Sequence, residues 1–182
     1  EGDGEVYDRE GAITADALRS YRTVADVEAY LSANLGRDLG SLANFGVLDA
    51  EGGAAVYEVH NHGFERLDAA AAPDGRLVVT NFARTGAEGE GAGYLRFERA
   101  TELFGELAPE RVAARTILHR FSRDLGHPLL DHPELAELAA QPASPPRWIS
   151  SRDCIDRPDT AATVVIVGRR ASTPATLWVI PG

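Results

Sequence analysis

The sequence predicts an α+β fold with antiparallel strands, and three observations indicate it. Apolar residues recur at helical spacing in the first 35 residues, and they alternate with a period of two between residues 45 and 81. Further helical segments follow, and two short apolar strands close the chain. Strands that follow strands, and helices that follow helices, favour separate α and β layers over a parallel βαβ sheet.

Two helices are expected near the N-terminus. The first is an amphipathic segment from Ile13 to Tyr21. Thr23 is typical of an N-cap residue for a second helix, which runs from Val24 to Leu35 with apolar residues at helical spacing. Glycines at positions 36 and 40 are expected to end this helix.

The centre of the chain predicts a four-stranded antiparallel meander. Its strands are expected at residues 45–48, 55–59, 64–67 and 77–81. Asp49–Gly53 and Pro73–Gly75 carry the residues that tight turns prefer.

The second half predicts helices and then a strand pair. A polar, glycine-rich loop covers residues 85–93, and two helices are expected at 95–107 and 109–125. A short helix at 133–140 precedes a proline-rich connector, and strands at 160–167 and 175–180 close the chain. The pattern contains no internal repeat, so residues 1–182 are expected to form a single domain.

Composition excludes several classes of function. The 182 residues are 44% apolar, which is enough for a buried core, and the net charge is −10. All 18 basic residues are arginine, and they are not clustered as phosphate binding requires, so no nucleic-acid partner is expected. No apolar run reaches the ~20 residues that span a bilayer, so no membrane partner is expected, and the compartment stays open.

Cofactors and metals are also not expected. The single cysteine excludes an intrachain disulfide and a cysteine-rich zinc site. His60 and His62 fall near a hairpin turn, while His127, Asp131 and His132 fall in a proline-containing loop. Neither group supplies three ligands locally, so turn and loop histidines are the favoured interpretation.

Four segments carry a resemblance to a known family. In order, they read Asn-Phe-Gly-Val-Leu-Asp-Ala (44–50), Ala-Ala-Val-Tyr-Glu-Val (54–59), Leu-Val-Val-Thr-Asn-Phe (77–82) and Tyr-Leu-Arg-Phe-Glu-Arg-Ala (94–100). Together with the closing strand pair, they resemble N-terminal-nucleophile hydrolases of the choloylglycine hydrolase and penicillin V acylase group. The chain is more similar still to the related acyl-coenzyme A:6-aminopenicillanic acid acyltransferase-like proteins, over most of residues 15 to 182.

The resemblance implies an αββα sandwich, in which two antiparallel sheets pack face to face between helices. It also implies cleavage or transfer of an acyl group from a small-molecule amide, through a thioester on an N-terminal cysteine and without a cofactor. Asn81 then corresponds to the oxyanion donor, and Arg96 corresponds to the arginine beside the thiol.

In that family the nucleophile lies in a segment that precedes the stretch matched here. Residue 1 is Glu, which has neither thiol nor hydroxyl, so the chain is expected to be the C-terminal portion of such a domain. An N-terminal segment or a second chain would then carry the nucleophilic cysteine, and these residues alone would be inactive. Assembly into a homo-oligomer is left open.

Other interpretations stay open. The chain could be a non-catalytic binding module that keeps a family-like sheet, or a hydrolase that uses Cys154. Two aspartates, Asp153 and Asp156, surround Cys154 and oppose a lowered thiol pKa, so an inert thiol is favoured. Asn81 could cap a turn, and Arg96 and Arg99 could be surface arginines that pair with Glu98 or Glu102, an interpretation that is kept for Arg99.

Overall fold

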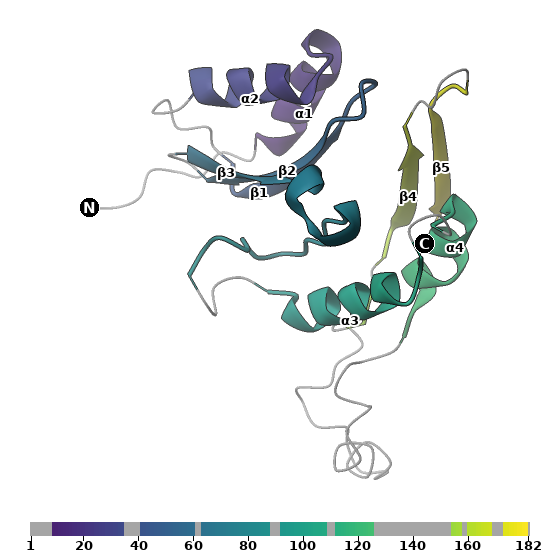
Figure 1. Cartoon of the computed structure of the whole chain (residues 1–182). Coiled ribbons are helices and arrows are strands. Elements are labelled where there is room, and N and C mark those ends of the chain that lie inside the picture. The colour runs from purple at the N-terminus through teal and green to yellow at the C-terminus, as the bar shows by residue number, and fades with distance from the viewer. Residues whose placement is uncertain are drawn as a thin grey trace. The chain divides into compact units, whose positions relative to one another are not determined.

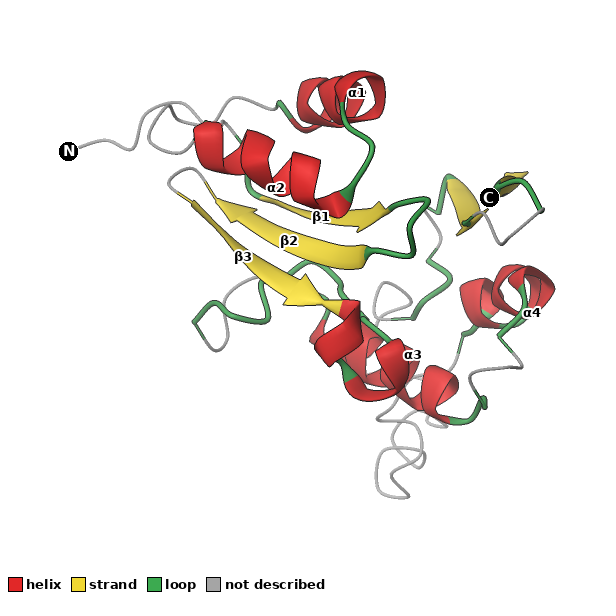
Figure 2. Ribbon diagram, turned by 45° about the horizontal axis from the view of Figure 1, so that its top comes forward, coloured by secondary structure: helices red, strands yellow, loops and turns green. Residues whose placement is uncertain are grey.

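The computed structural model divides into two compact units, one formed by Glu1–Gly91 with Gly168–Thr173 and the other by Ala92–Val167 with Pro174–Gly182. Each unit has its own antiparallel sheet and its own helices, which confirms a mixed α+β fold (Figures 1 and 2). The structure describes residues 9–34, 41–60, 63–87, 92–108, 112–125, 154–157, 160–168 and 173–181.

The first unit contains a three-stranded antiparallel meander. Its strands are β1 (Ala43–Leu48), β2 (Ala54–His60) and β3 (Gly63–Asp68), and β2 lies between the other two. Helices α1 (Glu10–Ser20) and α2 (Val24–Ala33) lie above this sheet (Figure 2). Three of the expected strands and both expected helices are therefore confirmed.

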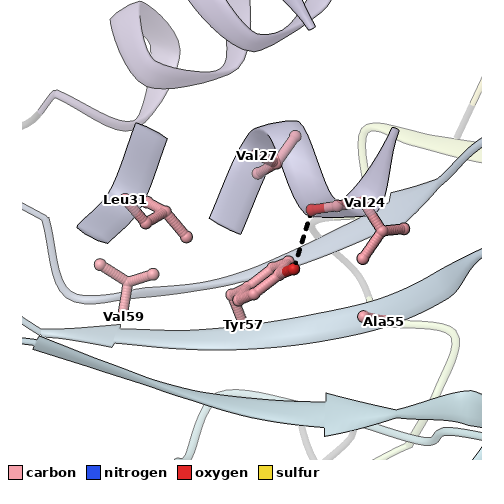
Figure 3. Packing of buried hydrophobic residues seen from close by; sticks show 6 residues of the cluster. All are labelled: Val24, Val27, Leu31, Ala55, Tyr57 and Val59. Atoms are coloured by element: carbon pink, nitrogen blue, oxygen red, sulfur yellow. Dashed lines mark hydrogen bonds between the residues drawn. The ribbon is translucent and has the colours of Figure 1, made fainter. Parts of the chain in front are cut away.

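The core of this unit lies between α2 and β2. Val24, Val27 and Leu31 fall on one face of α2, and they pack against Tyr57 and its neighbours on β2 (Figure 3). Tyr57 is completely buried, and its hydroxyl donates a hydrogen bond to the carbonyl of Val24 at 3.1 Å. Each buried Val or Leu side chain contributes roughly 1.5–3 kcal/mol, so this contact holds α2 on the sheet.

Two polar contacts fix the start of α2. Thr23 is the N-cap, as expected: its hydroxyl accepts from the Asp26 amide, and the Asp26 carboxylate accepts from the Thr23 amide. Asp49, in the turn after β1, accepts from the amides of Val24 and Gly53 at 3.0 and 2.7 Å. The hydrogen bond from Val24, followed by that from Gly53, holds the pKa of Asp49 below its usual value.

The fourth strand of the meander, expected at residues 77–81, does not form. Residues 76–80 have no regular structure, and Asn81 makes only an isolated bridge. The carbonyls on either side of Asn81 accept from the side chain of Asn44 on β1. A side-chain amide thus takes the place of a backbone ladder, which the apolar alternation alone did not reveal.

The second unit pairs β4 (Ala162–Val167) with β5 (Thr176–Pro181) in an antiparallel hairpin. Its helices are α3 (Tyr94–Gly105) and α4 (Ala114–His119), and a 3₁₀ turn follows α4 at Phe121–Arg123. The expected strand pair and the helix at 95–107 are confirmed. The helix expected at 109–125 is much shorter than predicted, and the one expected at 133–140 lies outside the described residues.

Aromatic packing and ion pairs hold the helical part of this unit together, among them Arg99 with Asp124 and Arg120 with Glu106. Leu103, Leu118 and Phe121 are buried, and the rings of Phe104 and Phe121 meet edge to face at 4.9 Å.

Within the described part of the chain, no helix is long and apolar enough to cross a membrane.

Alkaline titration tests the core around Tyr57. Burial raises the pKa of Tyr57 to about 12, whereas an unfolded tyrosine has a pKa of about 10. Between these two pKa values, the Tyr57 hydroxyl is ionised in the unfolded chain and protonated in the folded chain. The free energy of unfolding is therefore expected to fall as the pH rises from about 10 to about 12, by about 2 kcal/mol at most.

Denaturant unfolding at several pH values measures this loss. The chain contains no lysine, so tyrosine dominates the ionisation in this window. The pKa of Tyr30 is also raised by burial, and a Tyr57→Phe variant separates the two residues. Equal pH dependence in the variant and the parent protein would contradict the burial of the Tyr57 hydroxyl.

Candidate active site

A cavity of about 800 Å³ lies in the first unit. Cross-strand pairing places Asn44, Glu58 and Glu65 in one row across β1, β2 and β3. Successive strand residues point to opposite faces, so this row faces away from Tyr57 and from the helices. The cavity is lined by this row and by Leu42, Ala43, Val59, His60, Thr80, Asn81, Phe82, Ala83, Thr85, Gly86 and Ala87.

Glu58 anchors the segment that closes one side of the cavity. Its side chain belongs to a residue that is 3% exposed, in the middle of β2. The two carboxylate oxygens accept from the Arg84 amide at 2.6 Å, the Thr85 amide at 2.9 Å and the Thr85 hydroxyl at 2.7 Å. A buried carboxylate is costly unless donors surround it, so residues 84 and 85 are held firmly to the sheet.

Asn44 holds the same segment at residues 80 and 82, just before the residues that Glu58 binds. Its amide nitrogen donates to the carbonyls of Thr80 and Phe82, at 2.9 and 3.1 Å. These two carbonyls belong to the residues immediately before and after Asn81. The backbone of Asn81 is thus fixed on both sides by one side chain of β1.

Asn81 is exposed and contributes to the cavity lining. A carboxamide at a fixed position can donate a hydrogen bond to a developing oxyanion, and it does so with little reorganisation. Asn44 and Glu58 pair with the carbonyls of residues 80 and 82 and with the amides of residues 84 and 85. The turn-cap and oxyanion interpretations of Asn81 both stay predictions.

Arg96 lies in the first turn of α3, in the second unit, and it is half-buried. Asn81 and Arg96 therefore belong to different units, and the structure describes each of them within its own unit. The pairing of Arg96 with Asn81 in one site stays a prediction.

Arg99, one turn further along α3, has a structural role. It binds Asp124 through two hydrogen bonds, of 2.9 and 3.0 Å, and Glu102 through one of 3.2 Å. The pairing with Glu102 was expected, whereas the bidentate contact with Asp124 was not. Hydrogen bonds with Asp124, reinforced by Glu102, hold the pKa of Arg99 above its ordinary value.

Cys154 is placed as a structural thiol. It is 8% exposed, and its Sγ donates to the carbonyl of Leu125 at 3.3 Å. A nucleophilic cysteine is found partly exposed beside a base or a cationic group. The geometry therefore favours the inert thiol over a hydrolase that uses Cys154.

The histidine clusters give no metal site in the part that the structure covers. His60 is exposed at the end of β2 and lines the cavity. No group of three or more His, Cys, Asp or Glu residues is close enough to hold a metal ion among the described residues. His62, His127, Asp131 and His132 lie outside them.

Comparison with known proteins does not assign a family. No protein-family model, no curated protein and no solved structure matches the chain. The chemical interpretation of the cavity therefore depends on its own geometry and on the motif resemblance.

The sequence did not identify Asn44 and Glu58 as the residues that position Asn81. A signal was present for Glu58, because it is the one charged residue in an otherwise apolar run between Ala54 and Val59. Its burial needs donors from elsewhere in the chain. The sequence pattern does not show which segment supplies those donors, because the amides of Arg84 and Thr85 are backbone groups.

Replacing Glu58 with Gln tests the anchor. In either orientation the new amide NH₂ would face a backbone N–H, of Arg84 or of Thr85, and one hydrogen bond would become a repulsion. We expect a loss of about 2 kcal/mol in the free energy of unfolding, and faster hydrogen exchange at these two amides.

Glu65→Gln is the matched control, because Glu65 lies directly opposite Glu58 on β3 and is exposed. Its effect is expected to stay within about 0.5 kcal/mol. Similar losses in both variants, with unchanged exchange at residues 84 and 85, would show that Glu58 does not hold the segment.

Proposed function

We propose that this chain supplies part of the active site of an N-terminal-nucleophile amide hydrolase or acyltransferase. The nucleophile is the thiol of an N-terminal cysteine in a segment outside these 182 residues. The thiol attacks the carbonyl of an acyl amide, the amine leaves with a proton, and a thioester remains. Water then gives the carboxylic acid, or an acceptor amine takes the acyl group, and the thiol is regenerated.

The presentation of Asn81 is the observation that carries this proposal. An oxyanion donor is useful only if its position is fixed before the reaction. Asn81 lies at an exposed point of the cavity wall, and Asn44 fixes the carbonyls on both sides of it. In the proposed reaction its carboxamide N–H donates to the oxygen that becomes negative when the thiol attacks.

Arg96 has the second role in the proposal. A guanidinium near the nucleophile favours the thiolate over the thiol and so raises the fraction that can react. Arg96 lies in a segment with the order of the family motif, in the first turn of α3.

The αββα sandwich belongs to the same proposal. Each unit supports it separately, because each places helices against an antiparallel sheet: α2 packs on β2 and β3 in the first unit, and α4 packs on β4 in the second. A half-sandwich of this kind is the arrangement that each side of an αββα fold requires.

Isolation of the protein from its native source tests the proposal. Intact-mass analysis should find a partner segment that begins with cysteine, and incubation with a panel of N-acyl amides should add the mass of an acyl group to that segment. A folded, active species without such a cysteine would contradict the proposed nucleophile. A folded species that binds amides but forms no thioester would support a binding module instead.

Asn81→Ala in the active assembly is expected to lower kcat by about 10²- to 10³-fold, with little change in KM, because the donor acts mainly on the transition state. Steady-state kinetics on the best amide of the panel measure this. Asn34→Ala is the control, since Asn34 bonds the carbonyl of Tyr30 at the end of α2 and should leave kcat unchanged. Equal activity of the Asn81→Ala variant and the parent protein would remove Asn81 from the mechanism.

A further inference from the structure

The second unit contains an apolar slot that the short helix α4 leaves uncovered. Helix α4 has six residues, which extend about 9 Å, whereas the six residues of β5 extend about 20 Å. Helix α4 packs against β4 of the hairpin. The helix therefore covers only part of the hairpin, and a cavity of about 440 Å³ remains between them.

The walls of this slot are almost entirely apolar. Trp178 and Ile180 alternate on β5, and Trp178 pairs across the hairpin with Val165, which is buried. Leu118 on α4 is 3% exposed, yet the large indole of Trp178 stays 49% exposed. A large aromatic side chain with that much exposed surface beside a buried leucine offers contact area to a ligand.

Two polar side chains border the slot, and both come from α4. Arg115 and His119 are four residues apart, so they lie on one face of the helix, one turn from each other. The ion pairs of the described residues do not include Arg115, although the chain has 28 acidic residues and 18 basic ones. An arginine that borders an apolar slot, and that has no carboxylate partner within the described ranges, is suited to an external anion.

We propose that this slot binds a small amphiphilic carboxylate, with its apolar body against Trp178, Ile180 and Leu118 and its carboxylate on Arg115. His119 supplies a second hydrogen-bond donor to the same group. The volume and the lining match those of small-molecule sites, which are mostly apolar with a few polar groups that orient the ligand. The site stands independently of the proposed amide chemistry.

Octanoate is the probe, and the fluorescence of Trp178 is the readout. The chain has two tryptophans, so a Trp148→Phe background leaves Trp178 as the only reporter. We expect saturable binding with a Kd of about 1 mM. Octyltrimethylammonium, which has the same chain and the opposite charge, should bind at least about tenfold more weakly.

Arg115→Gln should weaken octanoate binding about tenfold, whereas Arg115→Lys should keep most of the affinity. Arg22→Gln is the charge-matched control, because Arg22 lies before α2 in the first unit and should leave the affinity unchanged. Equal affinity for both probes, equal effects of Arg115→Gln and Arg22→Gln, or the absence of saturable binding would each overturn the proposal.

Discussion

The carboxylate of Glu58 is the group on which the first unit depends. It lies on the central strand, it is almost fully buried, and it is surrounded by three donors from residues 84 and 85. A carboxylate buried without such donors would cost several kcal/mol. The sheet can therefore bury Glu58 only if residues 84 and 85 lie against it. The residue that makes β2 costly to bury is also the residue that brings the segment containing Asn81 to the sheet.

Because side chains alternate along β2, one strand serves two layers. Tyr57 faces α2 and carries the apolar core, while Glu58 faces the opposite side and carries the cavity wall. Asp49 adds a link at the end of β1, since its carboxylate bonds both the turn and the first residue of α2. The cavity is thus built on a support that the apolar core and these hydrogen bonds hold in place, as the proposed role of Asn81 requires.

Local patterns were sufficient to predict the elements whose cause is local. The capping residue Thr23, the turn at Asp49–Gly53 and the period-two strands β1 to β3 all follow from neighbouring residues. The segment at 77–81 has the same apolar alternation, but Asn44 binds its carbonyls from a distant strand, so it does not extend the ladder. Helix α4 is shorter than the pattern predicts, because it ends at His119 and a separate 3₁₀ turn follows at Phe121–Arg123.

The site was predictable only in part for the same reason. The Thr80-Asn81 motif indicated one residue of the cavity lining. The groups that hold its segment are the side chain of Asn44, 36 residues before Thr80, and the buried carboxylate of Glu58 on the next strand. Long-range contacts of this kind have no sequence period. Arg115 and His119 of α4 likewise form a candidate binding site only because the hairpin lies next to them in the fold.

Through-hydrogen-bond scalar couplings measured by NMR on the labelled chain test this account most directly. The account predicts correlations from the side-chain nitrogen of Asn44 to the carbonyl carbons of both Thr80 and Phe82. It also predicts no strand-type contacts between the backbone of residues 77–80 and that of β1 or β3. Missing Asn44 correlations, together with a regular backbone ladder through residues 77–81, would mean that Asn81 belongs to a fourth strand and that the proposed presentation of its side chain is wrong.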